Sequence, residues 1–293
     1  MPLYKPSGAA SPASILILPA AAVLSLVLAP LYAACSLYVP FIYLNIIFAV
    51  LFGAAAGVAG GAAAKATSTQ SPLLAGLLAA VGGWVGFVLS WSVWISLFLA
   101  FEGPSFPGFS DVMDFMTQPN VWFLPLEYPN EHLQFLKQLN EEGIWTIGRK
   151  SSSTVSGYLY LAVWIGEFLL FTIMAATTSA SAARRPYSNE ARSFLKGEPS
   201  PRLGVAFPEE PGVLPQVERS MSDGNLGYLT SAPTVEGGGP GYFVTIFSHP
   251  QSPWGTVTVT KTEQKGKKLE KKVLVANAVL QGGEIGLLRA RLT

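Results

Sequence analysis

The stretch GYLYLAVWIGEFLLFTIMAATT, residues Gly157–Thr178, decides the fold class of this chain. It is 22 residues long and contains one ionisable side chain, Glu167, near its middle. At about 1.5 Å per residue, such a helix extends about 33 Å and crosses the roughly 30 Å hydrocarbon core of a bilayer. A charged carboxylate at that depth costs about 3 kcal/mol or more unless it is neutral, paired or exposed to water. The stretch therefore predicts a membrane-spanning helix that contains one acid.

Three further apolar segments precede this stretch, and together they predict an all-α polytopic membrane protein with four transmembrane helices. They cover about Ala13–Ala34, Val39–Ala64 and Leu73–Ala100. The chain is 50% hydrophobic and 13% charged, whereas a soluble domain averages about 25% charged residues. The first segment also bears some likeness to a secretory signal, but Tyr32 fits the cleavage site poorly.

The rest of the chain is expected to be soluble. Residues 101–154 carry seven acids and three bases, and Glu131–Glu141 has the leucine spacing of an amphipathic helix. A second short helix is expected at Asp111–Met116. The predicted organisation is an N-terminal tail (1–12), transmembrane helices 1–3 (13–100), a periplasmic or extracellular loop with short amphipathic helices (101–154), transmembrane helix 4 (155–178), a cytoplasmic linker (179–240) and a small β-rich cytoplasmic domain (241–293).

The C-terminal region has the alternation of a small β-domain. Tyr242–Ser248, Gly255–Thr262 and Lys272–Val279 are the expected strands, and Glu284–Leu292 is the expected helix. The first two strands and their turn resemble the layout of a zinc ribbon, but the turn Ser248–Pro253 has no cysteine. The resemblance therefore implies no metal binding.

Glycines recur every fourth residue in two consecutive transmembrane segments. Gly53, Gly57 and Gly61 form one ridge, and Gly82 and Gly86 form another. Small residues at this spacing allow helix backbones to approach closely. We expect these helix-packing glycines to bring the second and third transmembrane helices together as a tight hairpin.

Positive charge predicts the orientation. Lys5, Lys65 and Arg184-Arg185 lie on one side of a four-helix topology, and the 101–154 loop, with a net charge of −4, lies on the other. Only the basic pair Arg149-Lys150, which lies in the 101–154 loop, is an exception to this charge distribution. Since bases favour the cytoplasmic side, we expect both termini in the cytoplasm, in a bacterial inner (plasma) membrane.

Lysines concentrate near the end of the chain. Such a cluster is usually a solvated hairpin tip, but near a membrane it can bind anionic lipid or a partner. The candidates are Lys265, Lys267, Lys268, Lys271 and Lys272.

Glu167, Asn45 and Trp164 are the candidate polar residues within the membrane. Ser90, Ser92 and the indoles of Trp84 and Trp91 are further candidate partners of the acid. Two interpretations stay open. Glu167 either binds a proton or an ion, or it is a hydrogen-bonded carboxyl that holds helices or subunits together.

Motifs of catalysis and metal binding are absent from the sequence. The chain has one cysteine, Cys35, and two histidines, His132 and His249, and it lacks nucleophile and phosphate-loop motifs. We therefore expect no enzyme activity, no catalytic residues, no metal and no cofactor.

The hypothesis for function is an integral membrane anchor or accessory subunit that mediates protein–protein assembly. The alternative is a small channel or transporter that uses Glu167 as a proton- or ion-binding group. Expected partners are membrane lipid and other protein subunits or further copies of the chain, and no nucleic acid.

Overall fold

The computed structural model describes residues 3–38, 42–100, 114, 117–118, 127–142, 145–146, 154–199, 219, 241–265 and 268–292. The chain divides into two compact units. The helical unit is Gly8–Ala183, and the sheet unit combines Met1–Ser7 with Arg184–Thr293.

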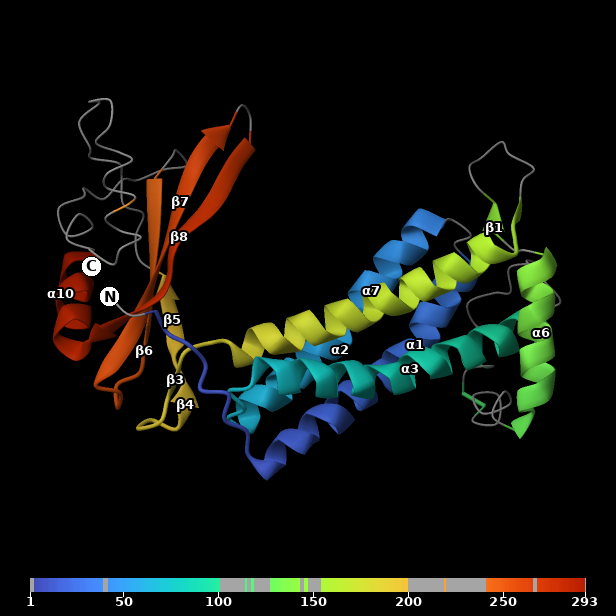
Figure 1. The fold of residues 1–293 in the computed structure, drawn as a ribbon, viewed down its shortest axis with the longest axis horizontal. Coiled ribbons are helices and arrows are strands. Elements are labelled where there is room, and N and C mark those ends of the chain that lie inside the picture. Colours follow the sequence, from blue (N-terminus) through green and yellow to red (C-terminus); the bar gives the residue numbers. More distant parts are fainter. Residues whose placement is uncertain are drawn as a thin grey trace. The chain divides into compact units, whose positions relative to one another are not determined.

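Four long helices build the helical unit (Figure 1). They are α1 (Ile17–Tyr38), α2 (Ile42–Ala66), α3 (Pro72–Ala100) and α7 (Tyr158–Ala183), and a 3₁₀ turn, η1 (Pro12–Leu16), leads into α1. All four are long and apolar enough to cross a membrane. The prediction of four such helices is confirmed.

Two helices extend beyond their predicted ends. α7 continues past Thr178 to Ala183, and within this extension Ser181 Oγ donates to the carbonyl of Thr177 over 2.7 Å. α1 continues past Ala34 to Tyr38, where the sequence analysis placed a connection. No residue between Ala34 and Tyr38 breaks a helix.

The glycine ridges face helices other than those expected. A Cβ on Gly57 would lie 2.6 Å from the carbonyl oxygen of Ala175, and one on Gly53 would lie 2.8 Å from the Cα of Phe171. The residue numbers of the contacting pairs increase together along both helices, so α2 and α7 run parallel. The ridge of α2 therefore packs on α7, not on α3.

The α3 ridge packs on α1 in the same way. Gly82 meets the backbone of Leu18, and Gly86 meets Ser25. The expected hairpin between the two ridges is wrong, because the ridges lie on helix faces that point toward the parallel neighbours α7 and α1. Other residues join α2 to α3: a Cβ on Gly60 would lie 2.6 Å from the Cβ of Ala79.

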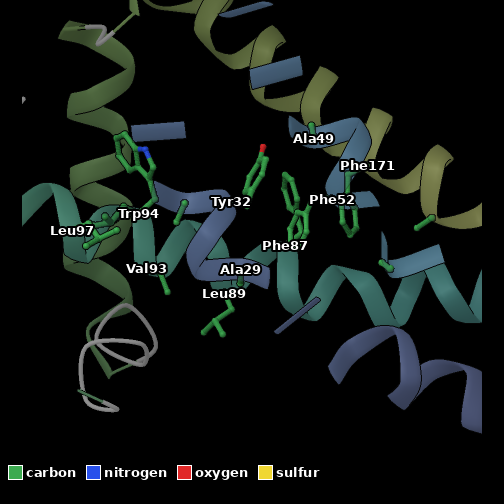
Figure 2. Close-up of a cluster of buried hydrophobic side chains, with 14 of the residues drawn as sticks. Ala29, Tyr32, Ala49, Phe52, Phe87, Leu89, Val93, Trp94, Leu97 and Phe171 are labelled. Carbon is green, nitrogen blue, oxygen red and sulfur yellow. The ribbon is translucent and has the colours of Figure 1, made fainter. Parts of the chain in front are cut away.

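An aromatic cluster fills the middle of the bundle (Figure 2). Tyr32 of α1 stacks on Phe52 of α2 with ring centroids 4.9 Å apart. Phe171 of α7 lies 5.0 Å from Phe52 and 5.2 Å from Phe87 of α3, again between centroids. Gly83 leaves room for this ring, since a Cβ there would lie 2.8 Å from Cζ of Phe171. The cluster joins all four helices.

The amphipathic helix α6 (Pro129–Glu142) lies across one end of the bundle (Figure 1). Leu139 is buried in the bundle core, and Phe135 packs against Phe98 with centroids 5.7 Å apart. We call this end, where α1 and α3 end and α2 and α7 begin, the distal end, and the opposite end the proximal end. A hairpin precedes α7, and each of its strands is two residues long: β1 (Trp145–Thr146) pairs with β2 (Thr154–Val155). The expected helix Asp111–Met116 lies outside the described residues except for Asp114.

The sheet unit contains a four-stranded antiparallel sheet. Its order is β5 (Lys196–Pro199), β6 (Gly241–Ser248), β7 (Trp254–Lys265) and β8 (Lys268–Gln281), and α10 (Gly282–Leu292) follows. The prediction of a small C-terminal β-sheet is confirmed. Its apolar core is Val244, Ile246, Val257, Val259, Val275, Ala278, Leu280, Ile285 and Leu288.

Strands also occur where a linker was predicted. β3 (Tyr187–Ser188) pairs with β4 (Ser193–Phe194), and β5 pairs with β6. The predicted linker is therefore corrected for residues 179–199. Local composition did not indicate these strands, because β5 is formed by pairing with an existing strand rather than by its own propensity.

The N-terminal tail is part of the sheet unit. The amide of Tyr4 donates to the carbonyl of Asn277 over 2.9 Å, and Leu3 forms a bridge with Ala278. The Tyr4 ring stacks on Trp254, and its hydroxyl accepts the amide of Tyr187 over 3.2 Å. The segment around Tyr4 therefore belongs to the sheet unit.

Candidate functional site: a buried polar cluster around Glu167

Glu167 lies on the buried stripe of α7. This stripe is Tyr160, Glu167, Phe171, Ala175, Ser179 and Ala183, and the Glu167 side chain is 2% exposed. Because α7 runs from Tyr158 to Ala183, the acid is about 14 Å from the distal end and about 24 Å from the proximal end. It is therefore displaced from the middle of the helix toward the distal end.

A small cavity adjoins the acid. The space open to the centre of a water-sized sphere is about 10 Å³, which is about the room that one water molecule needs. Residues from three helices line it. The lining residues are Tyr32, Ala33 and Ser36 from α1, Ser90, Trp91 and Trp94 from α3, and Glu167 from α7.

Two of the lining groups lack hydrogen-bond partners. The hydroxyl of Tyr32 lies next to the carboxyl of Glu167, yet neither Tyr32 Oη nor Glu167 Oε1 completes a hydrogen bond. A buried polar atom without a partner costs about 1–3 kcal/mol. Both residues line a space of one water's size.

Asn45 and Trp164 extend the polar cluster. Asn45 is fully buried, and both polar atoms of its amide lack partners. Nε1 of Trp164 is also unpaired, although its ring packs edge-on against Trp91 at 4.9 Å between centroids. Both residues lie closer to the distal end than Glu167 does.

The other expected partners divide into two groups. Ser90 and Trp91 line the cavity, and Ser90 Oγ donates to the carbonyl of Phe87 over 2.6 Å. Trp84 does not reach the acid, because its indole donates to Thr172 over 3.0 Å. Ser92 Oγ donates to the carbonyl of Val88 over 3.4 Å.

Sequence reasoning missed Tyr32. It was considered only as a residue of a possible cleavage site, but a tyrosine hydroxyl within an apolar segment is itself a candidate partner for an intramembrane acid. It reaches Glu167 because α1 packs against α3, and α3 packs against α7.

No counter-charge accompanies the acid. Among the described residues of the four helices, the only other charged side chain is Lys65, in the last turn of α2 at the proximal end. An ionised Glu167 would therefore be a buried charge without an opposite charge beside it, which is strongly unfavourable.

Polar groups of the proximal half are paired. Ser179 Oγ of α7 donates to the carbonyl of Ala75 over 3.0 Å, and Ser25 Oγ donates to the carbonyl of Ala21 over 2.7 Å. The hydroxyls of Ser14 and Thr69 share a hydrogen bond of 2.7 Å. The unpaired groups are thus a feature of the distal half.

The candidate lysines lie on the β7–β8 hairpin. The strand register sets Lys265 opposite Lys268, and Lys271 and Lys272 are exposed. Lys267 lies outside the described residues. Lys271 and Lys272 therefore give β8 two exposed positive charges.

Within the part of the chain that the structure describes, no three His, Cys, Asp or Glu side chains gather where a metal ion could bind. No protein-family model, curated protein or solved structure matches the chain.

Proposed function

We propose that the chain is a polytopic integral membrane protein that holds its sheet unit at the membrane surface for assembly with another protein. The observation that carries the proposal is a row on the sheet in which two exposed apolar side chains, Phe243 and Val273, flank Thr260. The register aligns Phe243 with Thr260 and Thr260 with Val273. Phe243 is 36% exposed and Val273 is 56% exposed. Apolar side chains grouped on a water-facing surface are typical of protein interfaces.

The attachment of the sheet unit supports a scaffolding function. α7 ends at Ala183, and β3 begins at Tyr187. The other attachment is the N-terminal segment at Tyr4. A unit held through both of its connections to the bundle stays near the membrane and presents its surface there. Tethering therefore raises the local concentration of the sheet unit that a membrane-bound partner meets.

The helix-packing glycines do not support partner binding. The ridge at Gly53 and Gly57 contacts α7, and the ridge at Gly82 and Gly86 contacts α1. Another subunit would have to displace a helix of the same chain to use them. Assembly through the sheet unit, where two apolar side chains of the sheet row are exposed, is the better supported route.

The proposed orientation puts the sheet unit and both termini in the cytoplasm of a bacterial cell, in the inner membrane. The basic residues Lys65 and Arg184-Arg185 lie at the proximal end of the helices, and bases favour the cytoplasmic side. The exposed lysines Lys271 and Lys272 of the hairpin suit an anionic leaflet on that side.

Site-specific photocrosslinking tests the assembly function. A photoreactive residue replaces Phe243 or Val273 in the full chain, expressed in its native membrane, and a matched control carries it at the exposed turn residue Gln251. We expect one adduct of defined mass from the two sheet positions and none from Gln251. Adducts at all three positions, or at none, together with a purified monomer, would refute an interface on this sheet face.

The alternative function, a channel or transporter, has one supporting observation, the buried acid beside a cavity. A cavity of about 10 Å³ offers room for one small ligand and not for a conduction path. It therefore supports a binding site.

A further inference from the structure

We propose that Glu167 is a proton-binding site that exchanges its proton with the distal side of the membrane only, through the cavity water, Tyr32 and Ser36. The inference rests on the part of the proposed function that the bundle spans a membrane. It does not depend on a partner protein.

The negative charge of an ionised Glu167 has no positive group beside it on the four described helices. Among the described residues, Tyr32 of α1 and Tyr160 of α7 are the titratable side chains that face Glu167, and both are neutral phenols over the ordinary pH range. α3 contributes Ser90 and the two cavity tryptophans, and α2 contributes the neutral Asn45. With no base on these helices near the acid, binding a proton is the direct way to remove the buried negative charge.

The ligand of the site is the proton. Proton transfer from hydronium converts the Glu167 carboxylate to the acid and leaves one neutral water. The cavity has room for one such water, Tyr32 and Glu167 are among the residues that line it, and Tyr32 Oη and Glu167 Oε1 have no hydrogen-bond partner. A water there can donate to one group and accept from the other, so it links the acid to the tyrosine hydroxyl.

The positions of the unpaired polar atoms give the direction of proton exchange. Ser36 lies one helical turn from Tyr32 toward the distal end and also lines the cavity. As far as the structure describes the helical unit, its unpaired buried side-chain atoms lie at the level of Glu167 or closer to the distal end. They include atoms of Tyr32, Asn45, Asn140, Trp164 and Glu167.

Aromatic rings lie between Glu167 and the proximal end. Phe171 lies one turn from Glu167 toward the proximal end, and it contacts Phe52 and Phe87 at 5.0 and 5.2 Å between centroids (Figure 2). Beyond these rings, Gly57 brings α2 against the α7 backbone. These apolar rings separate Glu167 from the hydroxyls of the proximal half, and Ser25 and Ser179 there already donate to backbone carbonyls.

Infrared difference spectroscopy on the full chain in liposomes tests this inference. A C-terminal affinity tag separates vesicles with the tag outside, whose proximal end faces the outer buffer, from vesicles with the tag inside. The outer buffer is then stepped between alkaline and acidic pH. The signal is the carbonyl stretch of a protonated carboxyl that Glu167→Gln lacks.

We expect this band to follow the pH step rapidly only in vesicles with the tag inside, and Tyr32→Phe to slow the response about tenfold or more. The matched control Ser25→Ala, on the proximal half of α1, should leave the rate unchanged. If Glu167→Gln does not fold, Glu167→Asp serves instead, since it should shift the band without removing it.

A band that never responds to pH, or an equal response in both vesicle populations, would overturn the inference. A chain that alkaline carbonate washes off the liposomes would instead contradict the membrane-spanning bundle itself, so the two failures are distinguishable.

Discussion

Replacing Gly57 by alanine tests how closely α2 and α7 are packed. The new Cβ would lie 2.6 Å from the carbonyl oxygen of Ala175 and 2.6 Å from Cβ of Thr178, whereas ordinary contact begins at 3.4 Å. α7 must therefore retreat by about 0.8 Å, because a helix carbonyl cannot rotate away. Such overpacking costs about 1–3 kcal/mol, and the better helix propensity of alanine returns up to about 1 kcal/mol. The expected net loss is up to about 2 kcal/mol.

Gly166→Ala is the matched control, because it is the same substitution on α7 with no atom within 4 Å of the new Cβ. The assay is thermal unfolding of the purified protein in detergent, followed by tryptophan fluorescence. At about 2–4 °C per kcal/mol, Gly57→Ala should melt up to about 8 °C below the wild type, and Gly166→Ala at or above it. If Gly57→Ala melts no lower than Gly166→Ala, the close α2–α7 contact is wrong.

Two predictions concern the sheet unit. Tyr4→Ala removes the stack on Trp254 and should destabilise the unit by about 1–3 kcal/mol, seen as faster limited proteolysis. Tyr4→Phe, its control, should cost about 1 kcal/mol, the bond from the Tyr187 amide. The second prediction is pH dependence. Ser188 Oγ donates to Glu190 over 2.7 Å and lowers the pKa of that carboxyl below its usual 4.5. A lowered folded pKa stabilises the fold above pH 4.5, and this stabilisation is lost as the pH falls through the folded value. Glu190→Gln should show a smaller acid-induced decline in denaturant unfolding, and an unchanged decline would contradict the assignment.

The four membrane-length helices could be predicted because their signal is local. An uncharged apolar run such as Gly157–Thr178 must satisfy its own backbone hydrogen bonds in a bilayer, and a helix is the way to do so. The signal for the strand at Gly255–Thr262 is also local, because its alternation of threonine and valine predicts a strand without knowledge of its neighbours. The ends were less certain. The small residues after Thr178 are compatible with both helix and linker, and backbone hydrogen bonding decides in favour of helix.

The sequence by itself determined that Glu167 lies in an apolar helix and that glycines line two others. Only the tertiary structure decided which surfaces meet. The α2 ridge packs on α7, Tyr32 comes to lie beside Glu167, and Tyr4 joins a sheet whose other strands are more than 180 residues away. The physical reason is that helix and strand periodicity specify which face of an element is buried. The partner of that face depends on close approach between distant segments, which no local pattern encodes.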